Sequence, residues 1–563
     1  MLTLRRLIGT VVLVALLGGS ACCEPAKLTH RWLFIFRDLT DTAKFTDTMS
    51  LLPRAQKAGY NAIVVSDKHL YQLDRASPAY IESLKLLQRT AAFYGMDLIP
   101  ICMPMGYAGG LLDYDRNLAE GLPVKDALFA AHHGTLSLDA DPPVAVTNGD
   151  FETASGDALP GWHYQMGIGL SAFADHNVAH TGGSSMRIER PLPGFSGVQQ
   201  IVKVSPFRQY HLSVWVKTEG MNRPGAISFP ITAAPRGREL NYAAVEIAAT
   251  QDWTRYDIVF NSLEHDRVAI GAGVEGGRRE ENGRVWFDDV SLEEIGLMNV
   301  LRRPGCPLTV RGENGVAYEE GRDFDEIRDP LLDPYDLYHQ PPIVRLTPNS
   351  RIKEGERVRV SYYHPVRIYT DQVVGCLSEP VIYDLQRAQV KRIDDLLHPK
   401  AFFMQHDEIR VANWDEVCQS RGLTPGQLLA DNVRRCVQII RDVNPEAKVW
   451  VWSDMFDPMH NAVDGYHLVH GTWEGSWEGL TSDIGIVNWA GFLEGRNCKW
   501  FADRGHEQVL AGYYDWDDEG EGIAAWLKAT EGVPGITGAM YTPWRERYDA
   551  IEAWAGKAWG RPE

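Results

Sequence analysis

Two adjacent carboxylates, Asp407 and Glu408, follow a short apolar run that begins at Ala401. A carboxyl group that keeps its proton near neutral pH can protonate a leaving oxygen, while a group opposite it stabilises the developing positive charge. Adjacent carboxylates raise each other's pKa, which helps one of them to stay protonated. In a regular strand neighbouring side chains face opposite ways, so both reach one pocket only where the chain twists or bulges. The pair is the first candidate for acid catalysis.

Other apolar runs also end in side chains that could bind a ligand. They are carboxylates, aromatic rings, amides and one arginine, the types expected where a sugar is stacked and hydrogen-bonded. These residues lack the spacing of a metal-ligand motif, so we predict no metal in the site and no cofactor for catalysis. The candidate substrate-binding residues are Arg37, Asp67, His406, Trp452, Asp454, Asn488, Trp489, Tyr514, Asp515 and Trp544.

Most of these candidates have structural alternatives that the sequence leaves open. Asp67 could cap a following helix, His406 could be buried against a backbone carbonyl, and Asp454 could be a turn residue. Arg37 could form an ion pair, and the tryptophans could fill a core. Their position in the fold must decide between these interpretations.

The elements that would position these residues are short apolar runs that alternate with amphipathic stretches. This pattern predicts parallel strands joined by helices, and eight such strands predict a (β/α)8 barrel, whose active sites lie at the carboxyl ends of the strands. The predicted strands are 32–36, 62–66, 97–103, 401–405, 448–453, 484–489, 508–514 and 536–541, and the predicted helices are 46–58, 79–94, 380–397, 425–443, 493–505, 520–530 and 545–559.

A long segment without comparable helices interrupts the barrel pattern after its third strand. Its first part alternates strands and turns, which predicts a jelly-roll β-sandwich inserted into the α/β barrel. We divide the chain into a signal peptide (1–23), the first part of the barrel (24–111), the sandwich (145–296), a β-rich connecting segment (297–377) and the second part of the barrel (378–563).

Three motifs of the inserted sandwich resemble those of carbohydrate-binding modules: Asn148-Gly149-Asp150-Phe151-Glu152, Pro160-Gly161-Trp162 and Trp286-Phe287-Asp288-Asp289-Val290. The resemblance implies either glycan binding or a purely structural role, because many sandwiches of this fold bind nothing. It also implies a structural calcium ion near the ends of the module, with Glu152 and Asp289 as candidate oxygen ligands.

The run from Ala401 to Glu408 resembles the Asp-Glu motif of family 20 glycoside hydrolases, the β-N-acetylhexosaminidases, in which the pair also ends the fourth barrel strand. Arg37 resembles that family's sugar-hydroxyl arginine. Trp452, Trp489 and Trp544 resemble its pocket aromatics, and Tyr514-Asp515 resembles its acetamide-binding tyrosine and neighbour. The family's glycine-rich approach to the pair is replaced here by Gln405-His406.

The resemblance implies substrate-assisted catalysis, in which the 2-acetamido oxygen of the sugar attacks the anomeric carbon. Glu408 would then be the general acid and base. Asp407 would orient the acetamide and stabilise the oxazolinium intermediate, and Tyr514 would donate a hydrogen bond to its oxygen.

The composition restricts the partners of the chain. Among 563 residues, 75 acidic and 56 basic side chains give a formal net charge of −19, which repels phosphate backbones and excludes a general nucleic-acid binder. The 17 Trp and 22 Tyr suit stacking on sugar rings, so we expect a glycan as the partner.

The first residues have the order of a secretory signal: Arg5 and Arg6, an apolar run over 7–17 and small residues over 18–21. We therefore predict an exported bacterial protein that is periplasmic, on the cell surface or secreted, without an integral membrane segment after signal removal. Cys22 and Cys23 lie where a lipoprotein signal places its lipidated cysteine, so a lipid anchor stays open. The later cysteines show no CxxC spacing, so we predict no zinc site; their disulfide pairing and the oligomeric state are left open.

These observations predict an exported glycoside hydrolase, exo-acting on a terminal N-acetylhexosamine by substrate-assisted retaining catalysis. One alternative is a glycosidase that uses Glu408 with Asp454 or Asp515 on a sugar without the acetamide. Another is a glycan-binding surface protein without catalysis.

Overall fold

A closed barrel of eight parallel strands forms the core of the computed structural model, which describes residues 28–235, 237–277 and 282–560. The predicted signal peptide, with Cys22 and Cys23, lies outside these residues. All eight strands predicted from the sequence are present, and β26 pairs with β1 to close the barrel. In order they are β1 (His30–Phe36), β2 (Ala62–Ser66), β3 (Asp97–Cys102), β20 (Ala401–Met404), β22 (Lys448–Trp452), β24 (Gly485–Asn488), β25 (Gln508–Leu510) and β26 (Ile536–Tyr541).

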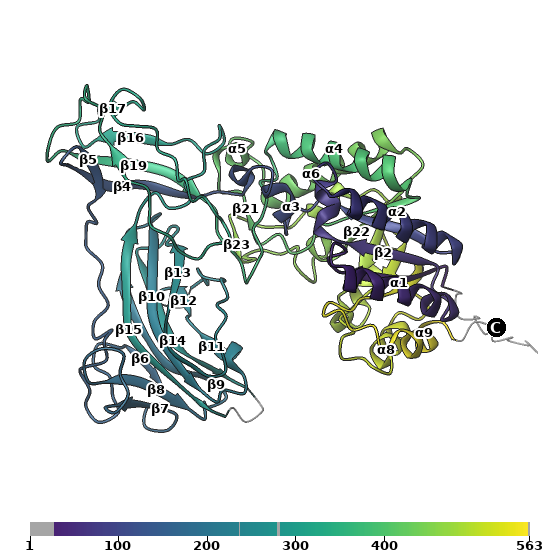
Figure 1. The fold of residues 1–563 in the computed structure, drawn as a ribbon, viewed down its shortest axis with the longest axis horizontal. Coiled ribbons are helices and arrows are strands. Elements are labelled where there is room, and N and C mark those ends of the chain that lie inside the picture. Colours follow the sequence, from purple (N-terminus) through teal and green to yellow (C-terminus); the bar gives the residue numbers. More distant parts are fainter. Residues whose placement is uncertain (1–27, 236, 278–281, 561–563) are drawn as a thin grey trace, which may run out of the picture.

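Helices cover the outside of the barrel (Figure 1). The helix α6 (Pro425–Val443) begins with Thr424 and Gln427 in a capping box and with Pro425 in its first turn, and its apolar face is buried. No helix in the described part of the chain is long and apolar enough to cross a membrane. The other barrel helices of seven or more residues are α1 (Thr42–Lys57), α2 (Pro78–Phe93), α4 (Pro380–Leu397), α7 (Arg496–Ala502), α8 (Glu521–Ala529) and α9 (Ile551–Ala558).

Large aromatic side chains fill the barrel interior. Trp32, Phe34, Phe403, Trp450 and Trp452 belong to one buried cluster, and the rings of Trp32 and Trp450 meet edge to face with centroids 4.8 Å apart. The alternate residues of the same strands pack outward against the helices. This alternation with a period of two residues decides which side chains can reach the mouth of the barrel.

The chain between β3 and β20 forms the predicted sandwich, so the predicted fold class is confirmed. Its two sheets pack face to face and lie apart from the barrel (Figure 1). One sheet has the order β13-β10-β15-β8-β7, and the other has the order β11-β14-β9-β6 with β12 paired to β14. The strands are β6 (Tyr164–Met166), β7 (Ala172–Asp175), β8 (Ser185–Glu189), β9 (Gly194–Lys203), β10 (Gln209–Glu219), β11 (Ile227–Ser228), β12 (Ile231–Ala233), β13 (Gln251–Asn261), β14 (Arg267–Gly276) and β15 (Arg284–Ile295).

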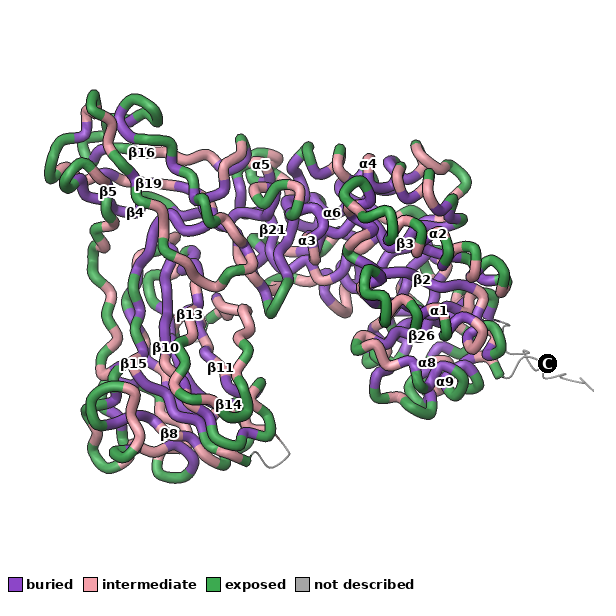
Figure 2. Tube along the Cα trace, in the orientation of Figure 1, coloured by how far each residue is buried: buried purple, intermediate pink, exposed green. Residues whose placement is uncertain are grey.

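A six-stranded antiparallel sheet joins the chain before the sandwich to the chain after it. Its order is β17-β16-β19-β4-β5-β18, and it has a buried core of its own. Figure 2 shows buried residues along these strands as well as in the sandwich and the barrel. The strands are β4 (Leu122–His132), β5 (Thr135–Leu138), β16 (Thr309–Gly312), β17 (Ala317–Tyr318), β18 (Val344–Arg345) and β19 (Arg357–His364).

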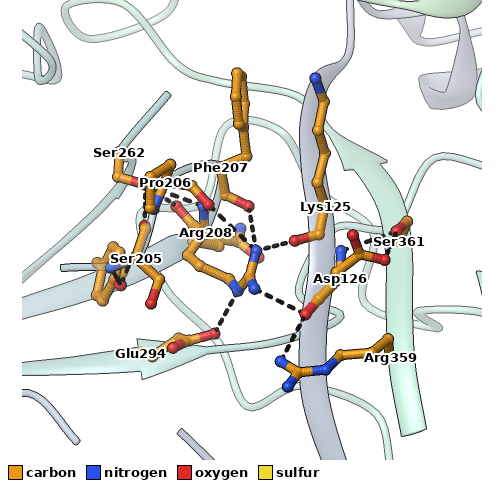
Figure 3. A network of polar contacts seen from close by, with 12 residues as sticks. Lys125, Asp126, Ser205, Pro206, Phe207, Arg208, Ser262, Glu294, Arg359 and Ser361 are labelled. Atoms are coloured by element: carbon orange, nitrogen blue, oxygen red, sulfur yellow. Dashed lines mark hydrogen bonds and ion pairs between the residues drawn. The ribbon is translucent and has the colours of Figure 1, made fainter. Parts of the chain in front are cut away.

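Arg208, in the turn before β10, ties the sandwich to this six-stranded sheet (Figure 3). Its guanidinium donates to the backbone carbonyls of Lys125 and Asp126 in β4. Its Nε lies 3.2 Å from Oε1 of Glu294, whose side chain is almost fully buried. Burial raises the pKa of Glu294 to about 7, although Arg208 and Arg359 lower it.

Arg208→Ala should destabilise the protein by about 3 kcal/mol, because it removes the contacts to β4 and leaves Glu294 buried without its partner. Urea unfolding followed by tryptophan fluorescence measures the change. As a control, Arg328→Ala removes an exposed pair with Glu326 and should change stability by less than about 1 kcal/mol. If both substitutions changed the free energy of unfolding by the same small amount, Arg208 would not be needed to hold the sandwich against the six-stranded sheet.

Candidate active site

The backbone after β20 brings Asp407 and Glu408 together. The strand ends at Met404, and Glu408 has a left-handed φ of 48°, so the pair no longer follows the strict alternation of a strand. The loop after β3 packs against this turn: a Cβ on Gly106 would lie 2.1 Å from the carbonyl oxygen of Asp407. A residue without a side chain is therefore required at 106.

Glu408 is the more accessible carboxylate, with 24% of its side chain exposed. Its Oε2 accepts a hydrogen bond from the Tyr107 hydroxyl at 2.6 Å, and its Oε1 lies 2.6 Å from the Arg410 guanidinium. Gln372, from the end of the insert, accepts from Arg410 and donates to the carbonyl of Glu408. The insert thus helps to hold this carboxylate.

Asp407 and Asp454 are buried next to Glu408. Asp454 Oδ2 accepts hydrogen bonds from the backbone N–H of Glu408 and from Asn461, both at 2.9 Å. Oδ1 of Asp407 and Oδ1 of Asp454 have no hydrogen-bond partner among the described residues. Burial raises the pKa of Asp407 well above its usual value, and the charges of Asp454 and Glu408 raise it further; burial also raises the pKa of Asp454.

A pocket of about 510 Å³ opens beside these carboxylates. Asp407 and Glu408 are not among its lining residues, but two lining tyrosines connect to this turn: the Tyr107 hydroxyl donates to Glu408, and the Tyr71 hydroxyl donates to Gln405. The barrel strands, the loop after β3 and the insert all contribute to the lining. The lining residues are Phe36, Arg37, Asp38, Ser66, Asp67, Lys68, Tyr71, Tyr107, Gly109, Gly110, Asp113, Tyr335, Asp371, Gln405 and Glu546.

Aromatic side chains surround the mouth of the barrel. The ring of Trp544 lies 5.1 Å from Phe34, 5.8 Å from Phe36 and 5.6 Å from Trp452. Trp452 is 2% exposed and belongs to the barrel core, whereas Phe36 is 41% exposed. Trp489 also packs against the core cluster, with its ring 4.6 Å from that of His460.

Arg37 and Asp67 line the pocket, but their charged atoms already have partners in the protein. Arg37 pairs with Asp47 of α1 at 2.5 Å and with Glu546 at 3.3 Å. Asp67 accepts from the backbone of Leu39 and His69 and from the Tyr80 hydroxyl, and it caps the short helix that follows.

His406 and Asn488 face the helices rather than the barrel axis. His406 is fully buried and bonds Asn432 of α6 at 2.9 Å, and burial lowers its pKa to about 4. Asn488 is fully buried beside α7, where it bonds Asn497. The structure does not bring these two side chains to the pocket.

Tyr514 and Asp515 also lie in structural surroundings. Tyr514 packs against Tyr541 and Trp554 in the outer layer, and its buried hydroxyl has no partner among the described residues. Burial raises the pKa of this hydroxyl. Asp515 accepts from the backbone N–H groups of Trp544 and Arg545 and so positions the loop that carries Trp544.

One rule of strand geometry separates the two groups of predicted residues. Because Phe34, Phe403 and Val487 face the interior, the residue two positions later on each strand faces the mouth. Those residues are Phe36, Gln405 and Trp489, whereas His406 and Asn488 are one position out of phase and face the helices. Arg37 is also out of phase, yet it reaches the pocket because β1 has already ended at Phe36. Counting two positions onward from the apolar residues that face the interior would have identified Phe36 and Gln405 in the sequence.

Other residues of the site carried no local signal in the sequence. Tyr107, Arg410, Tyr335 and Asp371 lie in irregular loops, and their approach to the pocket depends on how the insert folds back. Only the three-dimensional structure identifies them.

Two groups of side chains could be considered as metal sites, one at the pocket and one, predicted from the sequence, in the sandwich. Asp38, Asp67 and His69 lie close enough together at the pocket to share an ion, but Asp67 already accepts three hydrogen bonds. In the sandwich, Glu152 accepts from the backbone of Gly183, and Asp289 accepts from His180 and Thr181. Calcium at Glu152 and Asp289 stays a prediction.

Comparisons with known proteins find similar structures but no related sequence. No protein-family model matches the chain, and a search of the curated proteins finds no similar sequence. The chain is similar to a family 20 chitobiase of Flavobacterium johnsoniae, with 8% identity over 95% of this chain and 48% of that chain, at a TM-score of 0.37. It is also similar to a family 20 exo-β-N-acetylglucosaminidase of Vibrio harveyi, with 15% identity over 34% and 33% of the two chains, at a TM-score of 0.25.

The sandwich accounts for further matches. A family 22 xylan-binding domain from Paenibacillus barcinonensis is 15% identical over 29% of this chain and 97% of that chain, at a TM-score of 0.22. Both resemblances stated from the sequence, to family 20 glycoside hydrolases and to carbohydrate-binding modules, thus recur among the solved structures.

Asp407→Asn should change the pH dependence of stability in a defined direction. Because the folded state raises the pKa of Asp407, it binds this proton more tightly than the unfolded chain, and stability falls as the pH rises above the unfolded pKa of about 3.9. The variant lacks this titration. Wild-type stability relative to the variant should therefore decline as the pH rises above about 4 and until it passes the raised pKa of the folded state, by at most about 1.4 kcal/mol per pH unit.

Urea unfolding at several pH values measures this difference. Asp503→Asn, which removes an exposed carboxylate paired with Lys499, is the matched control for an Asp-to-Asn substitution at the surface. A difference between wild type and Asp407→Asn that is constant, or that grows with pH, would show that burial does not govern Asp407.

Proposed function

We propose that this chain is a glycoside hydrolase that removes a terminal N-acetylhexosamine by substrate-assisted, retaining catalysis. The observation that carries the proposal is the pairing of an accessible carboxylate, Glu408, with a buried one, Asp407, at the carboxyl end of a barrel strand beside an aromatic-lined mouth. We also propose that the chain is exported, because its first residues have the order of a secretory signal.

Glu408 is the proposed general acid and base. It protonates the glycosidic oxygen while the acetamido oxygen of the sugar attacks the anomeric carbon, so the bond to the leaving group breaks as the oxazolinium forms. Glu408 then takes a proton from the water that opens the oxazolinium. The greater exposure of Glu408 compared with Asp407 and Asp454 supports this assignment, because the acid must reach both substrate and water.

Asp407 is the proposed partner of the acetamide. Its Oδ1, which lacks a partner among the described residues, is an acceptor for the acetamide N–H once the ligand displaces the side chains that cover it. The forming oxazolinium would favour ionisation of Asp407, whose pKa burial raises, and the resulting negative charge would stabilise this cation in a buried setting. The Tyr71 and Tyr107 hydroxyls, rather than that of Tyr514, lie on the pocket side of this pair.

Aromatic rings and negative charge define the proposed substrate class. Phe36 and Trp544 offer faces for a sugar ring at the barrel mouth. Five acidic side chains line the pocket, against Arg37 and Lys68, so a neutral glycan is favoured over a sulfated or uronic one. The acidic residues are Asp38, Asp67, Asp113, Asp371 and Glu546.

The alternative with two protein carboxylates has less geometric support. Asp515 holds the backbone of Trp544 and Arg545, and Asp454 is fully buried with one oxygen bonded to Glu408 and Asn461. Asp515 has both oxygens bonded to the backbone, and Asp454 is fully buried, so neither is as accessible to a sugar as Glu408.

Glu408→Gln should lower kcat on an aryl N-acetyl-β-glucosaminide by at least about 100-fold, because general acid–base catalysis contributes about 100- to 10,000-fold. Spectrophotometric release of the aryl alcohol measures the rate. Glu474→Gln alters an exposed carboxylate and should keep the wild-type rate.

A panel of substrates separates the alternatives. Wild-type cleavage of acetamido glycosides, with strong inhibition by a thiazoline analogue of the oxazolinium, supports the proposal. Cleavage restricted to glycosides without the acetamide would favour two protein carboxylates, and glycan binding without any turnover would leave only a binding protein.

Tyr335→Phe should raise KM about 2- to 10-fold with little change in kcat, because it removes one hydroxyl that we assign to substrate binding. Tyr335 belongs to the insert and lines the pocket, and its buried hydroxyl has no partner among the described residues. The steady-state kinetics of the variant are compared with its melting temperature, which should not fall. An unchanged KM would remove Tyr335 from the substrate site.

A further inference from the structure

Four buried side chains from three separate segments meet where the insert joins the barrel. Glu120 precedes β4, Cys376 lies just before α4, and Asp415 and Cys418 lie in and beside α5 (Glu416–Gln419). Their ligand atoms all lie within 4.8 Å of one another, and each residue is at most 2% exposed. The backbone contacts of Glu120 to Val374 and of Cys376 to Leu118 fix the first two segments against each other.

The spacing of these atoms matches a tetrahedral metal ion. The sulfurs of Cys376 and Cys418 lie 3.6 Å apart, and Cys418 Sγ lies 3.8 Å from Glu120 Oε2. Two sulfurs bound at about 2.3 Å to one tetrahedral zinc ion lie about 3.8 Å apart. A disulfide would instead require the two sulfurs to approach to about 2.05 Å. The observed separation of the two sulfurs is therefore close to that of a shared ion and well beyond that of a disulfide.

The hydrogen bonds to the two carboxylates leave some of their oxygen lone pairs unused. Glu120 Oε1 accepts from the backbone of Trp414, which leaves Oε2 on the side of Cys418. Asp415 accepts one hydrogen bond on each oxygen, from the backbone of Cys418 and from Arg303, and each oxygen keeps a second lone pair. Arg303 also pairs with Glu379, so its single charge is shared between two carboxylates.

Contrary to the expectation from the cysteine spacing, we propose that Glu120, Cys376, Asp415 and Cys418 bind one Zn²⁺ ion that fastens the insert to the barrel. Two thiolates and two carboxylates suit this borderline-soft ion, and four protein ligands leave no open position, so the role is structural. Asp415 follows Arg410 on the same loop, and Cys376 follows Gln372. The ion would thus stabilise the two segments that carry Arg410 and Gln372, whose contact supports Glu408. The proposal of a zinc site does not depend on the proposed hydrolase activity.

Elemental analysis of the full-length protein, dialysed against a weak chelator, should find one zinc per chain. The double substitution Cys376→Ser and Cys418→Ser should reduce this at least tenfold. Cys498→Ser, which removes a buried thiol elsewhere, should keep the full amount. A strong chelator should lower the melting temperature of the wild type and of Cys498→Ser, and zinc should restore it; replacement by Co²⁺ should give thiolate-to-metal charge-transfer absorption.

Two results would overturn the proposal. One is wild-type protein that holds less than a tenth of an equivalent of metal and does not respond to chelator or added zinc. The other is a Cys376–Cys418 disulfide found by peptide mapping under non-reducing conditions. Both are measured on the wild type, so they decide the question even if the double variant fails to fold.

Discussion

Closure of the eight-stranded barrel is the constraint on which the rest of the structure depends. A closed barrel has an interior that side chains must fill, and here Trp32, Phe34, Phe403 and Trp450 fill it. No ligand can enter through such a core, so chemistry is confined to the carboxyl ends of the strands. The alternation of side chains then admits one residue in two to the mouth, and the other faces the helices. A residue's phase on its strand matters as much as its chemical type.

The insert respects this constraint because it begins after β3 and returns through α4 to β20, which pairs directly with β3. The barrel register is therefore uninterrupted, and the insertion is accommodated at the end where the pocket lies. In consequence the insert supplies part of the site itself. Tyr335 and Asp371 line the pocket, and Gln372 bonds Arg410, which holds Glu408. The pocket is a joint product of barrel and insert.

The barrel, its eight strands and the inserted sandwich could be predicted from the sequence because apolar periodicity and turn residues are local signals. The Asp407–Glu408 pair was found for the same reason, at the end of a strand. His406 and Tyr514 show where this reasoning stops: residue type and strand end were correct, but the side chains lie in the outer layer. Tyr107 and Arg410 approach Glu408 through loops whose folding depends on contacts distant in sequence, and no local pattern specifies them.

Arginines at the junctions add polar contacts to the apolar core that the insert shares with the barrel. Arg208 joins the sandwich to the six-stranded sheet, and Arg303, in the segment before β16, pairs with Asp415 at the start of α5. Arg238 joins the sandwich to the carbonyls of His467 and Val469. Each guanidinium offers five donors in a fixed plane, so one side chain can satisfy several buried carbonyls or carboxylates at once. A lysine at these positions would bring the charge but not the planar set of donors. The hydrogen bonds of these arginines therefore help to fix the position of the insert relative to the barrel.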